Sequence, residues 1–397
     1  MRKIWKIICA ICALVCAAGL GFVGWGARTL PDRFYSMDGS LPVHGVFTAT
    51  APAAALNAFS GDAGANEREL EYELKLLDVI PVKTVSVHVT GRKYLAVGGE
   101  LVGVRLKTKG VLVVGTEAFT SEGGKNVDPA AQAGIKKGDT LLTVNGIPIE
   151  TNETLTAAIQ NSDGKPVSIT LQRGAQTKTV ALTPEKTSGT GLYKGGLWVR
   201  DSTVGVGTLS FCDIENGKLA ALGHGIYDTD TASLLDVSSG EICTATVSSV
   251  KKGAVGAPGE ITGTLGQNAL GSITLNTDEG VFGDLYYLGN TPEVYPAATA
   301  SEVHTGNAQV ICTVTQGEKQ AYAVEIVKVN DAGSDRNMVV RITDETLLSL
   351  TGGIVQGMSG SPILQDGMLV GAITHVFVND PKCGYAIYAQ NMLEQTG

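Results

Sequence analysis

The sequence predicts a mainly β protein of several domains that follow one apolar N-terminal helix. Val, Ile, Thr and Leu recur in short runs separated by Gly, Asn-Gly and Asp-Gly, which is the pattern of strands joined by tight turns. The 397 residues suffice for two or three domains, each with its own core. The net charge of -9 excludes a protein that coats nucleic acid, because such a protein needs a basic surface.

The N-terminal segment has the length and charge of a membrane anchor. Residues 7–27 form a run of 21 residues without a charge, with three basic residues before it and Arg28 after it. This length spans a bilayer core, and the basic residues predict that the chain after Arg28 lies on the far side of the membrane. A cleaved signal peptide, cut near the small residues 17–19, is the alternative. We expect residues 1–28 to be a cytoplasmic tip and transmembrane anchor.

Residues 29–97 are predicted to combine a tether with a small β-module. The segment 48–66 is rich in Ala, has little periodicity and is typical of a flexible, easily cut tether. Residues 69–77 fit a short helix or strand, and residues 84–89 alternate as a strand does. A further apolar run at residues 94–97 completes the module, to which the sequence assigns no function.

A recognisable order of elements covers residues 98–185. A strand at residues 111–115 precedes the stretch DPAAQAGIKKGDTLLTVNGIPI at residues 128–149, and a longer helix follows at residues 152–160. This order and this stretch resemble a PDZ domain, in which a glycine-containing loop binds the C-terminal carboxylate of a peptide that adds as a strand to the sheet edge. Formation of a turn and strand alone is the alternative. The resemblance places the loop at Val102, Gly103, Val104, Arg105 and Leu106.

Residues 186–397 are predicted to form a second β domain. Residues 186–196 fit a linker, several apolar runs between residues 203 and 342 suggest a barrel or sandwich, and a helix is expected at residues 345–350. The histidines lack the spacing of a zinc site, so we expect no metal and no cofactor. Scattered cysteines favour small buried residues over disulfides. The four outside the anchor are Cys212, Cys243, Cys312 and Cys383.

The sharpest local motif is GMSGSP at residues 357–362. A nucleophilic serine needs an exposed hydroxyl on a tight turn whose N–H groups stabilise the developing oxyanion, and glycines permit that backbone. The motif therefore predicts Ser359 as nucleophile and the N–H groups of Gly357 and Ser359 as the oxyanion hole. It resembles GDSGGP of chymotrypsin-like proteases, which implies a double β-barrel. A glycine-rich turn without chemistry is the alternative.

A serine nucleophile also requires a base that takes its proton, and an acid that orients the base. His224, between two glycines, is the first candidate for the base; His375 is the second and His304 the third. Asp344, fifteen residues before Ser359, is the first candidate for the acid. It equally fits the N-cap of the predicted helix that follows it. Two alternatives for the acid lie close after the first histidine: Asp228 and Asp230.

Two longer stretches carry a closer resemblance. ALGHGIYDTDT at residues 221–231 and TGGIVQGMSGSPILQDGMLVGAITHVFVNDPKCGY at residues 351–385 are similar to the stage IV sporulation protein B peptidases. The resemblance implies a catalytic set of His224, Asp344 and Ser359. It also implies a signalling protease of endospore-forming bacteria, located between the forespore and mother-cell membranes, that cleaves itself near its N-terminus.

The same resemblance implies the substrate, a regulatory subunit of the membrane-embedded complex that processes the sigma-K precursor. We expect the self-cleavage within residues 48–66. Two other functions fit the sequence: a PDZ-based membrane scaffold with an inactive protease-like domain, and an esterase that uses the same serine. Self-cleavage that depends on Ser359 would separate an enzyme from a scaffold, and turnover of peptides against simple esters would separate the two enzymes.

Overall fold

The computed structural model describes residues 68–89, 91–288, 293–330 and 336–396, residues 33–36, 41 and 47–50, and residues 19, 21, 23–25, 27 and 28. Within these residues, no helix is long and apolar enough to cross a membrane. Most of the predicted anchor and residues 51–66 of the predicted tether lie outside the described residues.

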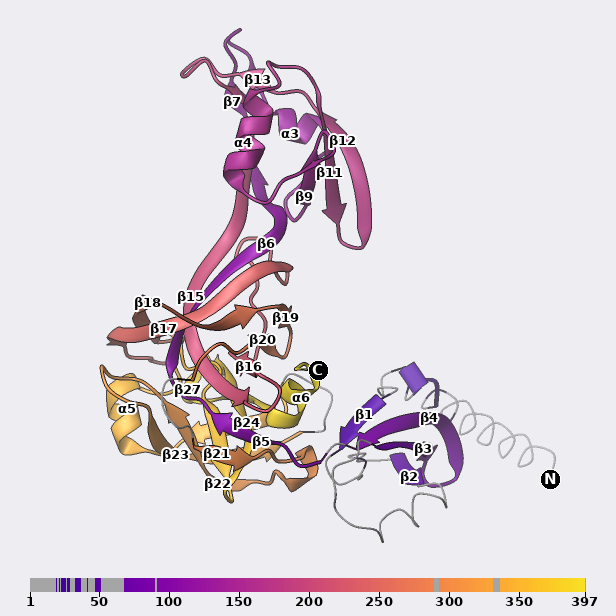
Figure 1. Cartoon of the computed structure of the whole chain (residues 1–397), viewed down its shortest axis with the longest axis vertical. Helices are drawn as coiled ribbons and strands as arrows, with labels where there is room; N and C mark the ends of the chain where they lie inside the picture. The colour runs from indigo at the N-terminus through magenta and orange to yellow at the C-terminus, as the bar shows by residue number, and fades with distance from the viewer. Residues whose placement is uncertain are drawn as a thin grey trace, which may run out of the picture.

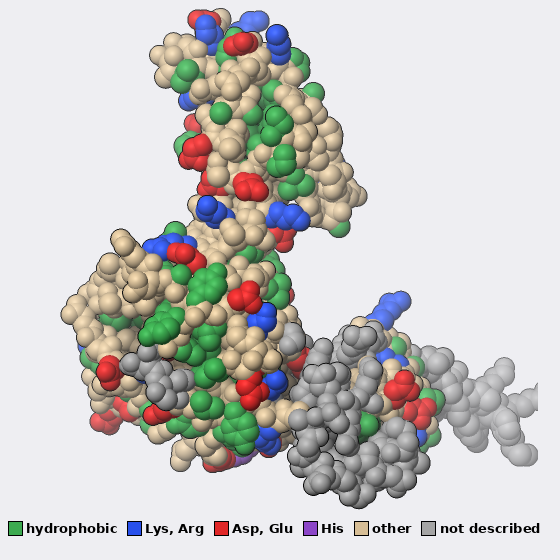
Figure 2. Space-filling view, viewed as in Figure 1, with side chains coloured by type: hydrophobic (Ala, Val, Ile, Leu, Met, Phe, Trp, Pro, Cys, Tyr) green, Lys and Arg blue, Asp and Glu red, His purple; other side chains and the backbone are tan. Residues whose placement is uncertain are grey.

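The described chain forms an upper lobe, a larger lower lobe and a small separate sheet beside the lower lobe (Figure 1). Two long strands, β6 (Leu101–Thr116) and β15 (Leu197–Asp213), run from one lobe to the other and pair antiparallel with each other. Figure 2 shows that the lobes meet at a narrow neck, where Lys, Arg, Asp and Glu side chains gather. The two strands are therefore shared between the lobes.

The small sheet has the strand order β1-β4-β3-β2. The segment that fits a helix or strand is a strand, β3, and Leu74, Val85 and Val87 form its buried core. Thr48 lies in β2, so the predicted tether begins inside this sheet. The strands are β1 (Arg33–Ser36), β2 (Phe47–Thr50), β3 (Arg68–Leu76) and β4 (Ile80–Val89).

The upper lobe is a sheet of the order β12-β11-β9-β6-β15 with two helices packed on it. Helix α4 begins at a capping box made by Thr151 and Thr154, and it buries Leu155 and Ile159 against the sheet. Small strands complete the lobe: β7 (Phe119–Thr120), β8 (Asn126–Val127), β10 (Ile147–Pro148), β13 (Glu185–Lys186) and β14 (Tyr193–Lys194). The main elements are α3 (Pro129–Gln132), β9 (Thr140–Val144), α4 (Asn152–Gln160), β11 (Val167–Arg173) and β12 (Gln176–Leu182).

The lower lobe has two halves. Strands β15 and β6 enter the first half and pair there with β16, β17 and β5. Its other strands extend these pairings. The strands of the first half are β5 (Tyr94–Val97), β16 (Lys218–Ala221), β17 (Val237–Lys251), β18 (Glu260–Ile273), β19 (Leu275–Thr277), β20 (Gly280–Asp284) and β21 (Val294–Pro296).

The second half of the lower lobe is a closed barrel of the order β22-β23-β24-β27-β26-β25. Its interior is apolar, with Val310, Val324, Val340 and Ile373 all fully buried. The barrel strands are β22 (Gly306–Cys312), β23 (Gln320–Val329), β24 (Met338–Ile342), β25 (Pro362–Gln365), β26 (Met368–Phe377) and β27 (Asp380–Tyr388). The helical elements are η2 (Ala300–Glu302), α5 (Glu345–Thr351) and α6 (Ala389–Glu394).

The lobes divide the chain at different residues from the predicted domain boundaries. Strand β5 was expected in the small module, but it pairs with β15 and β21 of the lower lobe. The first part of β6, expected in the PDZ domain, also lies in the lower lobe. The upper lobe is thus inserted into the lower lobe between β6 and β15, instead of preceding it.

The predicted carboxylate-binding loop is wrong in this structure. Val102, Gly103, Val104, Arg105 and Leu106 lie inside strand β6, between β15 on one edge and β17 on the other. Their backbone groups are therefore used within the sheet, and the three apolar side chains are at most 3% exposed. The glycine is there for packing: a Cβ would lie 2.4 Å from a side-chain carbon of Leu265.

The cysteine prediction is confirmed for the described part of the chain. All four residues are free thiols with buried side chains. Burial raises the pKa of Cys212 and that of Cys312 to about 12. They act as small apolar residues of the lower lobe, two in each half: Cys212, Cys243, Cys312 and Cys383.

Candidate active site

A cleft of about 550 Å³ brings most of the predicted catalytic residues together. His224 comes from the loop after β16, Ser359 and Gly357 come from the turn before β25, and His375 comes from β26. The cleft therefore lies where the two halves of the lower lobe meet. No Asp, Glu, Lys or Arg is among the described residues that line it.

Ser359 lies in a turn whose backbone requires glycine on both sides. Gly357 has φ +98° and Gly360 has φ +93°, in a region that residues with a Cβ rarely adopt. At Gly360 a Cβ would also lie 2.2 Å from the carbonyl oxygen of Thr208. The hydroxyl of Ser359 donates a hydrogen bond to the Thr374 carbonyl at 2.8 Å. The turn thus presents the serine at the cleft, and the hydroxyl must leave Thr374 before it can react.

The two predicted oxyanion donors are available in this turn. Among the described residues, no acceptor is found for the N–H groups of Gly357 and Ser359. The intervening Met358 N–H instead donates to the Val355 carbonyl at 3.1 Å. Two N–H groups without a protein acceptor beside a serine hydroxyl can bind the negative oxygen of a tetrahedral intermediate.

His224 is positioned by a short left-handed segment of backbone. Leu222 and Gly223 have φ of 70° and 67°, which turns the chain sharply at the end of β16. The Nδ1 of His224 lies 2.8 Å from the carbonyl of Gly225. Because a carbonyl can only accept, Nδ1 carries the proton of the neutral ring, and Nε2 has the lone pair of a general base.

His375, the second candidate for the base, lies against the first. The centroids of the His224 and His375 rings are 4.8 Å apart, with 36° between the planes. His375 directly follows Thr374, the acceptor of the Ser359 hydroxyl. The structure therefore places both histidines in the same cleft as the serine.

Asp344 lies outside the lining of the cleft. It is the N-cap of α5, and its carboxylate accepts hydrogen bonds from the backbone N–H of Leu347 at 3.0 Å and of Ala323 at 3.4 Å. Burial is the largest cause of the raised pKa of Cys312 in β22 and of Tyr322 in β23, and the negative charge of Asp344 raises both further. The structure thus shows the N-cap role that the sequence left open and does not bring Asp344 to the cleft.

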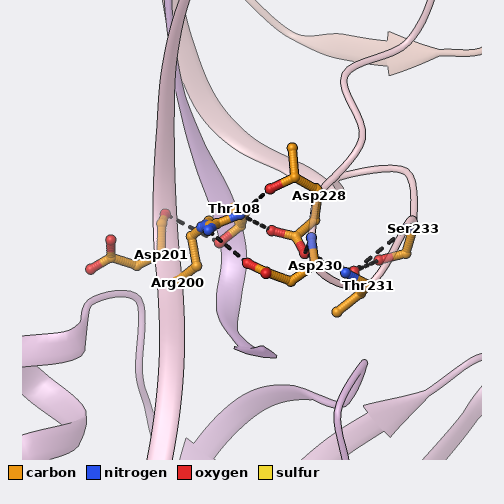
Figure 3. Close-up of polar contacts among 8 residues, drawn as sticks. Thr108, Arg200, Asp201, Asp228, Asp230, Thr231 and Ser233 are labelled. Carbon is orange, nitrogen blue, oxygen red and sulfur yellow. Dashed lines mark hydrogen bonds and ion pairs between the residues drawn. The ribbon is translucent and has the colours of Figure 1, made fainter. Parts of the chain in front are cut away.

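The two alternative acids are held by an arginine (Figure 3). Arg200 of β15 forms ion pairs with Asp228 and, at 2.9 Å, with Asp230. Burial alone raises the pKa of Asp228, but hydrogen bonds from Thr231 and Asp230 and the charge of Arg200 lower it overall. Both carboxylates are therefore used to fix the loop that follows His224.

His304, the third candidate for the base, is not among the residues that line the cleft. Its Nε2 lies 2.8 Å from the carboxylate of Asp366, and both side chains are exposed. A hydrogen bond to the Thr305 carbonyl and the bond to Asp366 raise the pKa of His304. This pair is a surface contact of the second half.

A second cleft, of about 310 Å³, lies in the upper lobe between α4 and the start of β15. Leu155 and Ile159 line it from the helix, and Gly195, Gly196 and Trp198 line it from the opposite wall. This Gly-Gly pair falls within the predicted linker at residues 186–196. Its position directly before an apolar strand was the signal in the sequence that could have identified it as part of a groove. In the described chain, β6 pairs with one edge of this part of β15 and no strand pairs with the other.

A β lobe with a serine and two histidines at its cleft, joined to a lobe with a helix–strand groove, has the parts of a protease that carries a peptide-binding domain. Two family models match the chain in these places. The model described as SpoIVB peptidase S55 matches residues 191–393, half of the chain, and the PDZ domain model matches residues 127–173. The chain belongs to the SpoIVB peptidase S55 family.

Single proteins match over shorter parts. The chain is 31% identical over 90 residues to the "Probable protease eep" of Enterococcus faecalis, over 22% of this chain. It spans about a fifth of that relative, 21% of its length. A crystal structure of the Rv3671c protease in an inactive form covers 48% of this chain and 84% of that chain, with 15% identity and a TM-score of 0.29.

Proposed function

We propose that this PDZ-containing protease is a serine endopeptidase with Ser359 as nucleophile and His224 as general base. The observation that carries the proposal is the meeting of three groups in one cleft: the Ser359 hydroxyl, the His224 ring and the two N–H groups of the serine turn. Catalytic hydrogen bonds are often absent before substrate binds, so the bond from Ser359 to Thr374 is compatible with this role.

In the proposed reaction, the Ser359 oxygen attacks the carbonyl carbon of the scissile peptide bond while Nε2 of His224 takes the hydroxyl proton. The negative oxygen of the tetrahedral intermediate binds to the N–H groups of Gly357 and Ser359. Protonated His224 then gives its proton to the leaving amine, and an acyl-enzyme remains. Water, deprotonated by the same histidine, releases the acid and restores the serine. The Gly225 carbonyl keeps the ring in the required tautomer.

The walls of the cleft favour an apolar polypeptide as substrate. Val204, Tyr227 and Val378 line the cleft and are exposed by 64%, 46% and 51%. Exposed apolar side chains at a site mark a surface that contacts a partner. The Ala-rich segment 48–66 of this chain has matching chemistry, which supports the proposed self-cleavage there.

The upper lobe is proposed to bind the C-terminus of a peptide, but in a different place from the one the sequence suggested. The peptide adds as a strand to the unpaired edge of β15, with its apolar side chains against Leu155 and Ile159 of α4. Its carboxylate lies at Gly195 and Gly196, where Lys194 also lines the cleft and supplies positive charge.

The finer role is a proposal that rests on the family resemblance and the N-terminal sequence. We propose that the chain is anchored by residues 7–27 with its bulk extracytoplasmic, between the forespore and mother-cell membranes, and acts as a signalling protease in sporulation. Its proposed partner is a regulatory subunit of the membrane-embedded complex that processes the sigma-K precursor. The apolar run and the basic residues before it support the anchoring and the orientation.

Expression of the full-length chain beside its Ser359→Ala variant, with N-terminal sequencing of the fragments, tests the proposal. We expect the wild type to be cut within residues 48–66 and the variant to stay intact. Ser349→Ala, which removes an exposed serine hydroxyl of α5 outside the cleft, is the control and should still be cut. If both wild type and Ser359→Ala stay intact, or both are cut alike, the inactive scaffold explains the fold better. Release of a simple ester without any peptide cleavage would support an esterase.

A further inference from the structure

Thr208 of β15 lies behind the serine turn and contacts it through several atoms. Its backbone N–H donates to the Ser359 carbonyl at 2.9 Å, and its hydroxyl donates to the Gly357 carbonyl at 2.8 Å. Its own carbonyl accepts from the N–H of Leu222 at 3.2 Å. Thr208 is only 2% exposed. It therefore connects the turn that carries the nucleophile to the strand end that precedes the histidine.

The two N–H groups of the oxyanion hole belong to peptide planes that are held from behind. The first plane carries the Gln356 carbonyl, which accepts a hydrogen bond from the Ile261 N–H at 2.8 Å. The second plane carries the Met358 carbonyl, which accepts from the Ser361 N–H at 2.9 Å. Since N–H and C=O of one peptide plane point in opposite directions, these bonds aim both N–H groups.

The plane between them depends on Thr208. This plane carries the Gly357 carbonyl, and its other end is the Met358 N–H, which donates to Val355. Glycine at φ +98° gives this plane more rotational freedom than any other residue would. The Thr208 hydroxyl accepts a hydrogen bond from the Ser361 hydroxyl at 3.4 Å and donates one to the Gly357 carbonyl. The three groups therefore form a buried chain of hydrogen bonds.

We propose that Thr208 is the positioning residue of the oxyanion hole. Its hydroxyl holds the Gly357 carbonyl toward the buried interior and thereby keeps the neighbouring N–H groups directed at the cleft. Without the hydroxyl, this buried carbonyl loses its partner, and the plane rotates about Gly357 to regain one. Rotation turns a donor away from the place where the negative oxygen must bind. The role deepens the proposed serine-peptidase function and rests on it.

The test compares Thr208→Val, which has the same shape without the hydroxyl, with Thr208→Ser, which keeps the hydroxyl. Both are made in the full-length chain and assayed on a peptide substrate and with a peptide aldehyde, which forms a tetrahedral adduct with the serine. We expect Thr208→Val to lower kcat about 10- to 100-fold with KM nearly unchanged. Binding of the aldehyde inhibitor should weaken by the same factor. Thr208→Ser should match the wild type.

Ser210 provides a matched control on the same strand. Its side chain is fully buried, and its hydroxyl has no hydrogen-bond partner among the described residues. Ser210→Ala therefore removes a buried hydroxyl of β15 that makes no hydrogen bond to the turn, and it should keep the wild-type kcat. A loss of activity in Ser210→Ala equal to that in Thr208→Val would show a general effect on the strand and overturn the proposal.

Thermal unfolding of each variant shows whether it is folded. If Thr208→Val does not fold, Thr208→Ala replaces it, and a kcat equal to that of Thr208→Ser overturns the proposal. The proposal is also overturned if a variant without the hydroxyl keeps the full wild-type kcat, or if only its KM changes. If the wild type is no more active than Ser359→Ala, the proposed peptidase function itself is overturned, and the role of Thr208 with it. This result is distinct from the failure of the Thr208 proposal alone.

Discussion

Replacing Asp344 by asparagine separates the two roles that the sequence offers for this residue. In the structure the carboxylate accepts hydrogen bonds from the N–H groups of Leu347 and Ala323 at the start of α5. The side-chain oxygen of asparagine can accept the capping bond from Leu347, because asparagine and aspartate are equally good N-caps. The negative charge and the long bond from Ala323, which ends on the second carboxylate oxygen, are lost. The acid of a serine-protease triad does not tolerate this change, which there lowers kcat by about 10⁴.

We expect Asp344→Asn to keep kcat within about threefold of the wild type, since the carboxylate caps a helix away from the cleft. Its stability should fall by about 0.3–1 kcal/mol, the usual value of one negative charge at a helix N-terminus. Asp344→Ala removes the cap itself, and it should cost about 1 kcal/mol. For a lobe of this size the loss corresponds to a Tm lower by about 2–4 °C.

Steady-state kinetics on a peptide substrate and thermal unfolding of the full-length variants measure both quantities. Glu345→Gln is the control, because it removes an exposed charge from the same first turn without touching the cap. A fall in kcat near 10⁴ in Asp344→Asn, with Tm unchanged, would refute the reasoning. It would show that Asp344 reaches His224 in the active enzyme and that the family's catalytic set holds for this chain.

Four further predictions test other parts of the structure. Arg200→Ala leaves the buried Asp228 carboxylate without its cation, so denaturant unfolding should show a free energy of unfolding lower by about 1–3 kcal/mol. The kcat should fall as well, because the loop that follows the histidine is no longer fixed. Unchanged stability would contradict the pairing. Because the pKa of Asp228 is lowered overall, its contribution to wild-type stability is present at neutral pH and should be lost only below about pH 4, as followed by acid unfolding. Gly360→Ala places a Cβ against backbone at φ +93° and should abolish activity, whereas Gly367→Ala, at φ +76° with no atom within 4 Å of the added carbon, should only reduce Tm. Thiol titration at pH 8 should leave Cys212 unreactive until the protein unfolds, since its pKa is about 12, and rapid labelling of the native protein would contradict its burial.

The serine turn could be predicted because its chemistry is local. Glycines around Ser359 are required by the backbone of the turn, and that requirement is visible in the motif itself. His224 could be identified for a similar reason, since glycines on both sides mark the sharp turn that follows β16. The strand content of the chain follows from its short β-branched runs between turns, which also explains why the barrel was expected.

The residues that sequence reasoning misplaced depend on pairing between distant segments. Gly103 fits a loop by composition, but it is a packing position under Leu265, a contact across more than 160 residues. Gly195 and Gly196 have the composition of a linker, and only the position of α4 opposite them shows a groove. Thr208 carries no motif at all, because its role comes from hydrogen bonds to a turn about 150 residues away.

The insertion of the upper lobe into the lower lobe sets an order for folding. Leu106 of β6 and Thr203 of β15 pair, although nearly a hundred residues separate them. Closing so long a flexible loop would cost on the order of 4 kcal/mol of chain entropy. The upper lobe removes most of this cost if it folds first, because its own sheet already sets β6 and β15 side by side where they leave it. The upper lobe is thus also the template on which the lower lobe assembles, and the strands of the lower lobe that come first in the chain can pair with the later ones only after the upper lobe has been synthesised.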